Sequence, residues 1–162
     1  TELIIILDRS GSMQDRRADH EGGLRSFVRD QRTLAGEVRL TFVRFDTFDP
    51  FEVVYDGVPL ATVEDTRLAL IPRGGTPLLE AVGRTLAHVA ERLGRQESPP
   101  GLVIVMVITD GQENSSKHDW TKARVKALIG AARAALPHQP NSRRNYRRCA
   151  HDPRGPRPIW TP

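Results

Sequence analysis

The sequence lacks the features of disulfide-stabilised secreted proteins and of membrane proteins. Its single cysteine, Cys149, excludes an internal disulfide and suits a reducing compartment. No apolar stretch approaches the roughly 18 residues of a membrane-spanning helix, so we expect no transmembrane span. The chain opens at Thr1 without the basic segment and cleavage site of a secretory signal, and we therefore expect a cytoplasmic protein.

The sequence also lacks a strong charge of either sign outside its C-terminal part. Residues 136–162 carry six arginines and one acid, which leaves −1 for residues 1–135 out of the total of +4. The same segment holds six of the 12 prolines and no apolar run of strand length. We expect one domain at 1–135 and a disordered basic tail at 136–162. A reading-frame change near residue 135 would leave a similar tail.

Apolar periodicity in residues 1–135 predicts strands that alternate with helices. The expected elements are strands at 2–8, 37–46, 51–60 and 102–110 and helices at 14–33, 77–93 and 118–136. The second and third strands alternate in polarity and indicate a hairpin, closed by a turn at Gly57. This order predicts an α/β three-layer sandwich, with a mostly parallel sheet and one antiparallel strand.

Polar residues follow the two all-apolar strands and precede the middle helix. The first strand ends in "DRSGS", with Asp8, Ser10 and Ser12; the last ends in "TDG", with Asp110; and "GGTP", with Thr76, opens the helix. Sites in parallel sheets lie outside the carboxyl ends of the strands. We therefore expect these five side chains to lie together and the two all-apolar strands to be neighbours.

All five side chains offer hard oxygen donors, and none is His or Cys. This chemistry excludes a zinc-type site and suits Mg²⁺, Mn²⁺ or Ca²⁺. The spacing of two lets Ser10 and Ser12 project from one turn, and we expect Gly11 to permit the tight backbone between them. With only two carboxylates the ion is under-neutralised, which favours an open position for an external carboxylate.

The motifs "DRSGSM", "GGTPL" and "ITDG" together resemble the metal-ion-dependent adhesion site of von Willebrand factor type A domains. The resemblance covers about residues 2–135 and implies a Rossmann-like fold. It implies direct metal contacts from Ser10, Ser12 and Thr76, with Asp8 and Asp110 acting through water. Mg²⁺ or Mn²⁺ is the implied ion, with Ca²⁺ as second choice, and the implied ligand is a protein that presents an Asp or Glu carboxylate.

Two further features bear on the resemblance. The short hairpin and "TDGQENSS" are similar to compact bacterial or phage members of the family. Such domains continue past the third helix with another parallel strand and a closing helix, which we expect to be missing here.

Residues next to the five donors are candidates for contact with the ligand. These predicted ligand-binding residues are Arg9, Gly11, Gly75 and Gly111. Arg9 and Arg73 could guide an acidic ligand, although we expect them to be solvated surface arginines. Asp46, which ends the second strand, could support the site from behind or be an ordinary turn acid.

Three other interpretations stay open. Ser12 and Thr76 could simply cap helices. Asp8 could be the nucleophile of a Mg²⁺-dependent phosphoryl-transfer enzyme, although Ser10 stands where a second acid is expected and no lysine lies near the motifs. The arginines of the tail could bind nucleic acid, which we expect only through this segment.

Overall fold

The computed structural model describes residues 1–110 and 113–135, and the expected tail lies outside them. Its strands and helices are β1 (Glu2–Asp8), α1 (Arg17–Thr33), β2 (Arg39–Phe45), β3 (Glu52–Pro59), α2 (Leu78–Gly94), β4 (Val103–Ile108) and α3 (Lys122–Ala135). The sheet order is β3-β2-β1-β4. Strand β1 is parallel to β2 and β4, whereas β3 is antiparallel to β2. The predicted fold class and the predicted pairing of the first and last strands are confirmed.

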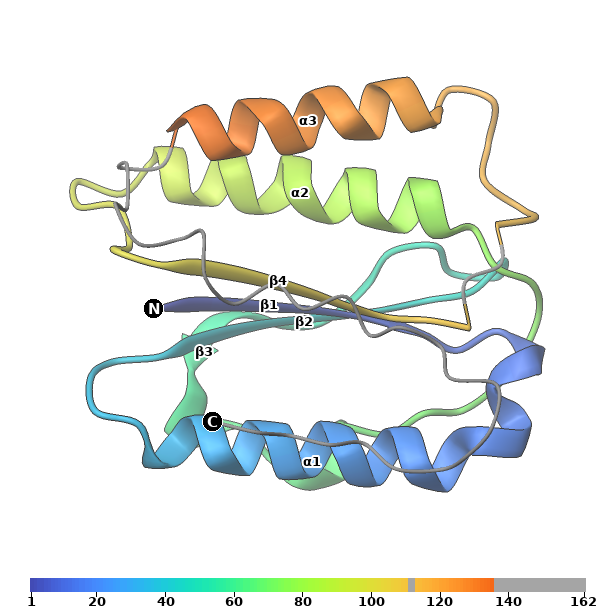
Figure 1. The fold of residues 1–162 in the computed structure, drawn as a ribbon, viewed down its shortest axis with the longest axis horizontal. Coiled ribbons are helices and arrows are strands. Elements are labelled where there is room, and N and C mark those ends of the chain that lie inside the picture. Colours follow the sequence, from blue (N-terminus) through green and yellow to red (C-terminus); the bar gives the residue numbers. More distant parts are fainter. Residues whose placement is uncertain (111–112, 136–162) are drawn as a thin grey trace, which may run out of the picture.

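Strand β1 lies at the centre of the sheet and is buried over all of its seven residues. Alternate side chains face opposite sides because a strand has a period of two. Leu3, Ile5 and Leu7 join the core cluster that contains Leu24 and Val28 of α1, and Ile4 and Ile6 join the cluster on the α2 side. Figure 1 shows α1 on one side of the sheet and α2 on the other.

Helix α3 packs against α2, on the same side of the sheet (Figure 1). The ring of Trp120, just before α3, lies on Gly83 of α2, where an added Cβ would come within 2.2 Å of it. Within residues 1–110 and 113–135 no further strand pairs with β4, so β4 forms an edge of the sheet.

The hairpin of β2 and β3 differs from the expectation at Gly57. This glycine does not close a turn but lies inside β3 with a φ of +58°. The pairing of the two strands shifts register around Phe42, as in a β-bulge. The Gly57 amide donates to the hydroxyl of Thr41, at 3.0 Å.

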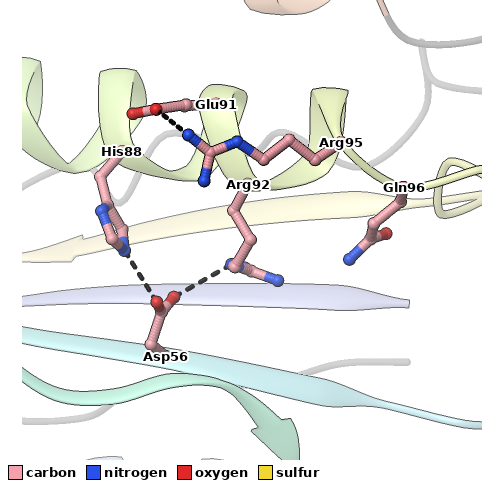
Figure 2. A pocket seen from close by; sticks show the side chains of 6 residues that line it. All are labelled: Asp56, His88, Glu91, Arg92, Arg95 and Gln96. Carbon is pink, nitrogen blue, oxygen red and sulfur yellow. Dashed lines mark hydrogen bonds and ion pairs between the residues drawn. The ribbon is translucent and has the colours of Figure 1, made fainter.

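Charged side chains connect the β3 edge to α2. Figure 2 shows Asp56 of β3 between His88 and Arg92, at 2.9 and 3.0 Å, on the wall of a cavity of about 300 Å³. Arg92 also pairs with Glu2, of which 1% is exposed, and donates to Thr41 at 2.9 Å. Through Arg92, α2 is therefore connected to β1, β2 and β3.

Candidate metal site

The loop after β1 and the loop before α2 are joined by backbone hydrogen bonds. The Gly11 amide donates to the Gly74 carbonyl at 2.9 Å, and the Arg73 amide donates to the Arg9 carbonyl at 2.7 Å. The first loop continues as a 3₁₀-helix (Gly11–Arg16), which leads into α1. The helix expected at 14–33 is therefore a 3₁₀-helix that starts three residues earlier, at Gly11, and continues as α1 from Arg17.

The segment after β4 holds the start of α2, and the sequence did not indicate this role. Asn114 and Thr76 exchange two hydrogen bonds, at 2.8 and 3.1 Å. The Leu79 amide donates to Glu113 at 2.7 Å, and the Glu80 amide donates to the Ser116 hydroxyl at 3.0 Å. These side chains satisfy the first amides of α2, which have no partner within the helix. They thereby fix Thr76 relative to the end of β4.

Asp8 ends β1, contacts the loop that follows β1 and the segment that follows β4, and is 0% exposed. One of its carboxylate oxygens accepts the Ser10 amide, and the other accepts the Thr109 hydroxyl, both at 2.7 Å. Burial raises the pKa of Asp8, and these hydrogen bonds only partly oppose it. The negative charge of Asp110 raises this pKa further, which places the two carboxylates within electrostatic reach.

The three hydroxyls are not used as helix caps. The Ser10 and Ser12 hydroxyls lie 3.1 Å apart and share a hydrogen bond. The N-cap residues of the 3₁₀-helix and of α1 make no capping hydrogen bond through their side chains. The N-cap of α2 is Pro77, which makes none either. Among the described residues the Thr76 hydroxyl has no hydrogen-bond partner, although only 1% of Thr76 is exposed. The capping interpretation of Ser12 and Thr76 is wrong.

The glycines of the site differ from the expectation. Gly11 has no positive φ, and a Cβ there would meet only the Gly74 carbonyl at an ordinary 3.5 Å. Gly74 has a φ of +65°, and its Cβ would lie 2.4 Å from the Thr47 hydroxyl. A Cβ on Gly75 would lie 2.6 Å from the Ser115 hydroxyl. The tight backbone is therefore at Gly74 and Gly75, whereas Gly111 lies outside the described residues.

Arg9 is a buried residue, and the expectation of a solvated arginine is wrong for it. It is 4% exposed, pairs with Asp46 at 2.5 Å and also pairs with Glu52. Asp46 is 0% exposed and accepts Arg73 at 2.7 Å and the amides of residues 48 and 49. Burial alone would raise the pKa of Asp46, but the hydrogen bonds from Arg73 and the two amides, with the charge of Arg9, outweigh burial and lower this pKa. Asp46 is thus more than a turn acid, because it fixes Arg9 behind the site.

The donor set suits a hard divalent cation. Within residues 1–110 and 113–135 no cluster of three or more His, Cys, Asp and Glu side chains could hold a metal. The candidate site instead offers the hydroxyls of Ser10, Ser12 and Thr76, with Asp8 buried and Asp110 exposed. A cation beside Asp8 and Asp110 would offset the burial and the repulsion that raise the pKa of Asp8. These residues therefore fit Mg²⁺ or Mn²⁺ better than zinc.

The sequence matches no protein-family model and no curated protein, but solved structures share its fold. A von Willebrand factor type A structure from Catenulispora acidiphila aligns with a TM-score of 0.56 and 22% identity, covering 82% of this chain and 30% of that one. The three N-terminal domains of the type V pili tip protein Mfa5 from Porphyromonas gingivalis align with a TM-score of 0.55 and 19% identity. That alignment covers 75% of this chain and 22% of that one. The fold is therefore that of von Willebrand factor type A domains, and this chain spans less than a third of either neighbour.

Among the helices that the structure describes, none combines the length and the apolar character that a bilayer crossing requires.

Proposed function

We propose that this chain is a non-enzymatic protein-binding module that takes Mg²⁺ or Mn²⁺ at the candidate metal site. An Asp or Glu carboxylate of a protein partner completes the coordination of the ion. The observation that carries the proposal is the Thr76 hydroxyl, for which the described residues provide no hydrogen-bond partner, in a residue that is 1% exposed. Its loop is joined to the Ser10–Ser12 turn by the hydrogen bond from the Gly11 amide to the Gly74 carbonyl. The fold is also shared with a pilus tip protein, which agrees with a role in protein binding.

Exposed apolar side chains next to the candidate metal site could contact the partner beside its acidic residue. Phe48 is 74% exposed, although its amide donates to Asp46 at 2.6 Å and the Arg73 guanidinium lies 5.6 Å from its ring centre. Ile71, on the adjoining loop, is 55% exposed. An aromatic ring held in place at the surface contributes contact area at low entropic cost. We propose that Phe48 contacts the partner beside its carboxylate.

Titration of the metal-free protein with Mn²⁺, followed by electron paramagnetic resonance, tests the metal. We expect binding in the micromolar to millimolar range, because neutral hydroxyls make a weak cage. Asp8→Ala should abolish this binding, whereas Asp15→Ala, in the neighbouring 3₁₀-helix, should leave it unchanged. Undiminished Mn²⁺ binding by Asp8→Ala would show that the site is elsewhere.

Thr76→Ala tests the role of the partner carboxylate. We expect it to weaken binding of acidic peptides, selected from a peptide array in Mg²⁺, by about tenfold, and to change Mn²⁺ affinity less. Phe48→Ala should weaken peptide binding without any change in metal affinity. Peptide binding by Thr76→Ala at wild-type affinity would reject the adhesion mechanism even if the metal binds.

The phosphoryl-transfer alternative is less well supported by the geometry. Asp8 is 0% exposed, and both of its carboxylate oxygens accept hydrogen bonds. An attacking carboxylate oxygen needs an open path to the phosphorus atom, which the burial of Asp8 restricts. We therefore propose no catalytic residue.

A further inference from the structure

Among residues 1–110 and 113–135, β4 is an edge strand, and its own sequence lacks the usual protection of such edges. Its sequence, VIVMVI, contains no charge and no proline. Val105 and Val107 are 40% and 39% exposed. Exposed edges with these properties pair with other strands unless charges, prolines or bulges prevent it.

An apolar groove runs beside this edge on the α2 side of the sheet. It has a volume of about 620 Å³, and its walls include Val105 and Val107 of β4, Leu86 and Val89 of α2 and Ile129 of α3. Ile129 is 36% exposed, and α3 packs mainly on α2. Arg133 is the only charged side chain on the walls formed by the described residues.

The residues that follow α3 in this sequence are poorly suited to cover the groove. Among residues 136–162 no apolar run reaches strand length, and six prolines interrupt the segment. Proline cannot donate to a strand ladder and is confined to edges. The six arginines of the segment would lose hydration against an apolar wall that carries no acid.

We propose that the occupant of this edge is a second copy of the chain, whose β4 pairs antiparallel with the first. An antiparallel pair of identical strands has a twofold axis perpendicular to the sheet, so α1 of both copies stays on one side and α2 of both copies on the other. The apolar grooves of the two copies then lie side by side above the paired β4 strands. Ile129 of each copy can cover the valines of β4 from both copies.

The chemistry of the edge is complementary to itself. A strand without charge meets its own copy without like-charge repulsion, and apolar surface is removed from water on both sides. The pairing also satisfies the outer backbone groups of β4. The candidate metal site lies at the carboxyl end of the sheet, so its loops remain outside the strand pairing.

Sedimentation velocity of the full chain across a concentration series tests the proposal. We expect a species of twice the chain mass of 18.1 kDa. Val105→Lys should weaken the dimer by at least about tenfold, because pairing would bury an unpartnered ammonium group. The control is Val53→Lys on β3, where the same residue type is 37% exposed at the opposite edge and should leave the dimer unchanged. Circular dichroism should show the wild-type fold for both variants.

Three results would overturn the proposal. One is a full chain that sediments as a monomer at every concentration. Another is a dimer that Val53→Lys disrupts as much as Val105→Lys does. A full-length monomer that dimerises only when the chain ends at Ala135 would show that residues 136–162 cover β4, which also contradicts it. Ile129→Lys gives a second variant away from the strand ladder, and it should weaken the dimer as well.

Discussion

Strands β3 and β4 form the two edges of one sheet, but they are fixed by different interactions. On the β3 side, Arg9 and Arg92 reach from other elements to Glu52 and Asp56. The β3 edge also has a bulged pairing and a left-handed glycine. Strand β4 has only apolar side chains and pairs, among the described residues, with β1 alone.

This difference indicates which changes the fold should tolerate. The same two arginines also pair with the buried carboxylates of Asp46 and Glu2. Such buried ion pairs are sensitive to the loss of one partner, because the other charge stays desolvated. An exposed apolar edge loses little when one side chain changes, because that side chain is already partly in water. The β3 side should therefore govern the free energy of unfolding, and the β4 side should govern association.

Asp46→Ala should give the largest loss of stability. It removes the acid that pairs with Arg9, and the Arg9 guanidinium is 5% exposed. We expect a loss of about 3–5 kcal/mol in the free energy of unfolding, measured by urea denaturation. Arg73→Ala is the control: its side chain is 48% exposed, and its loss should lower the free energy of unfolding much less than the loss of Asp46 does. Equal effects would show that the burial of Arg9 is unimportant.

Arg92→Ala should have the next largest effect, because it leaves the buried carboxylate of Glu2 without its cation. We expect a loss of about 2–4 kcal/mol in thermal or urea unfolding. His88→Ala removes the exposed contact to Asp56 and should cost under about 1 kcal/mol. If Arg92→Ala and His88→Ala lower the free energy of unfolding by the same amount, then the β3 edge does not depend on the buried pair of Arg92 and Glu2.

Gly74→Ala should cost about 1–3 kcal/mol, because the backbone is left-handed there and a Cβ would strike Thr47. Gly11→Ala should cost less than Gly74→Ala, since its backbone and its surroundings accept a Cβ. Both variants are compared by thermal unfolding without metal. A larger loss for Gly11→Ala would place the tight backbone after β1 instead.

Asp8→Asn should have the smallest effect on stability and the opposite sign. Burial raises the pKa of Asp8, so its ionised form is disfavoured in the metal-free fold. The contribution of Asp8 is most favourable below its unfolded pKa and is lost as pH rises through the higher folded pKa. We therefore expect Asp8→Asn to raise metal-free stability by about 1 kcal/mol at neutral pH and not in acid.

Melting temperatures of wild type and Asp8→Asn across a pH series measure this effect. The variant should also lose Mn²⁺ binding, since the ion then lacks the buried negative charge. A variant that is less stable at neutral pH would mean that Asp8 serves the fold and not a ligand.

The sequence by itself determined the order of the elements, the layers and the place of the candidate donors. These follow from local patterns, because a period of two or of 3.6 residues assigns each segment its structure and its apolar face. The all-apolar run before Asp8 predicted a central strand, and β1 is buried throughout. The end of each strand then gave the positions of Asp8 and Asp110.

Only the tertiary structure decided which charged and polar side chains meet. Arg9 resembles an exposed arginine in the sequence, because its partner Asp46 lies 37 residues away. Asn114 reaches Thr76 across 38 residues, and no local pattern indicates the pair. The need for glycine at position 74 arises from Thr47 on another loop. The exposure of β4 likewise depends on which strands pair with it, and strand pairing is a contact through space that periodicity along the chain does not encode.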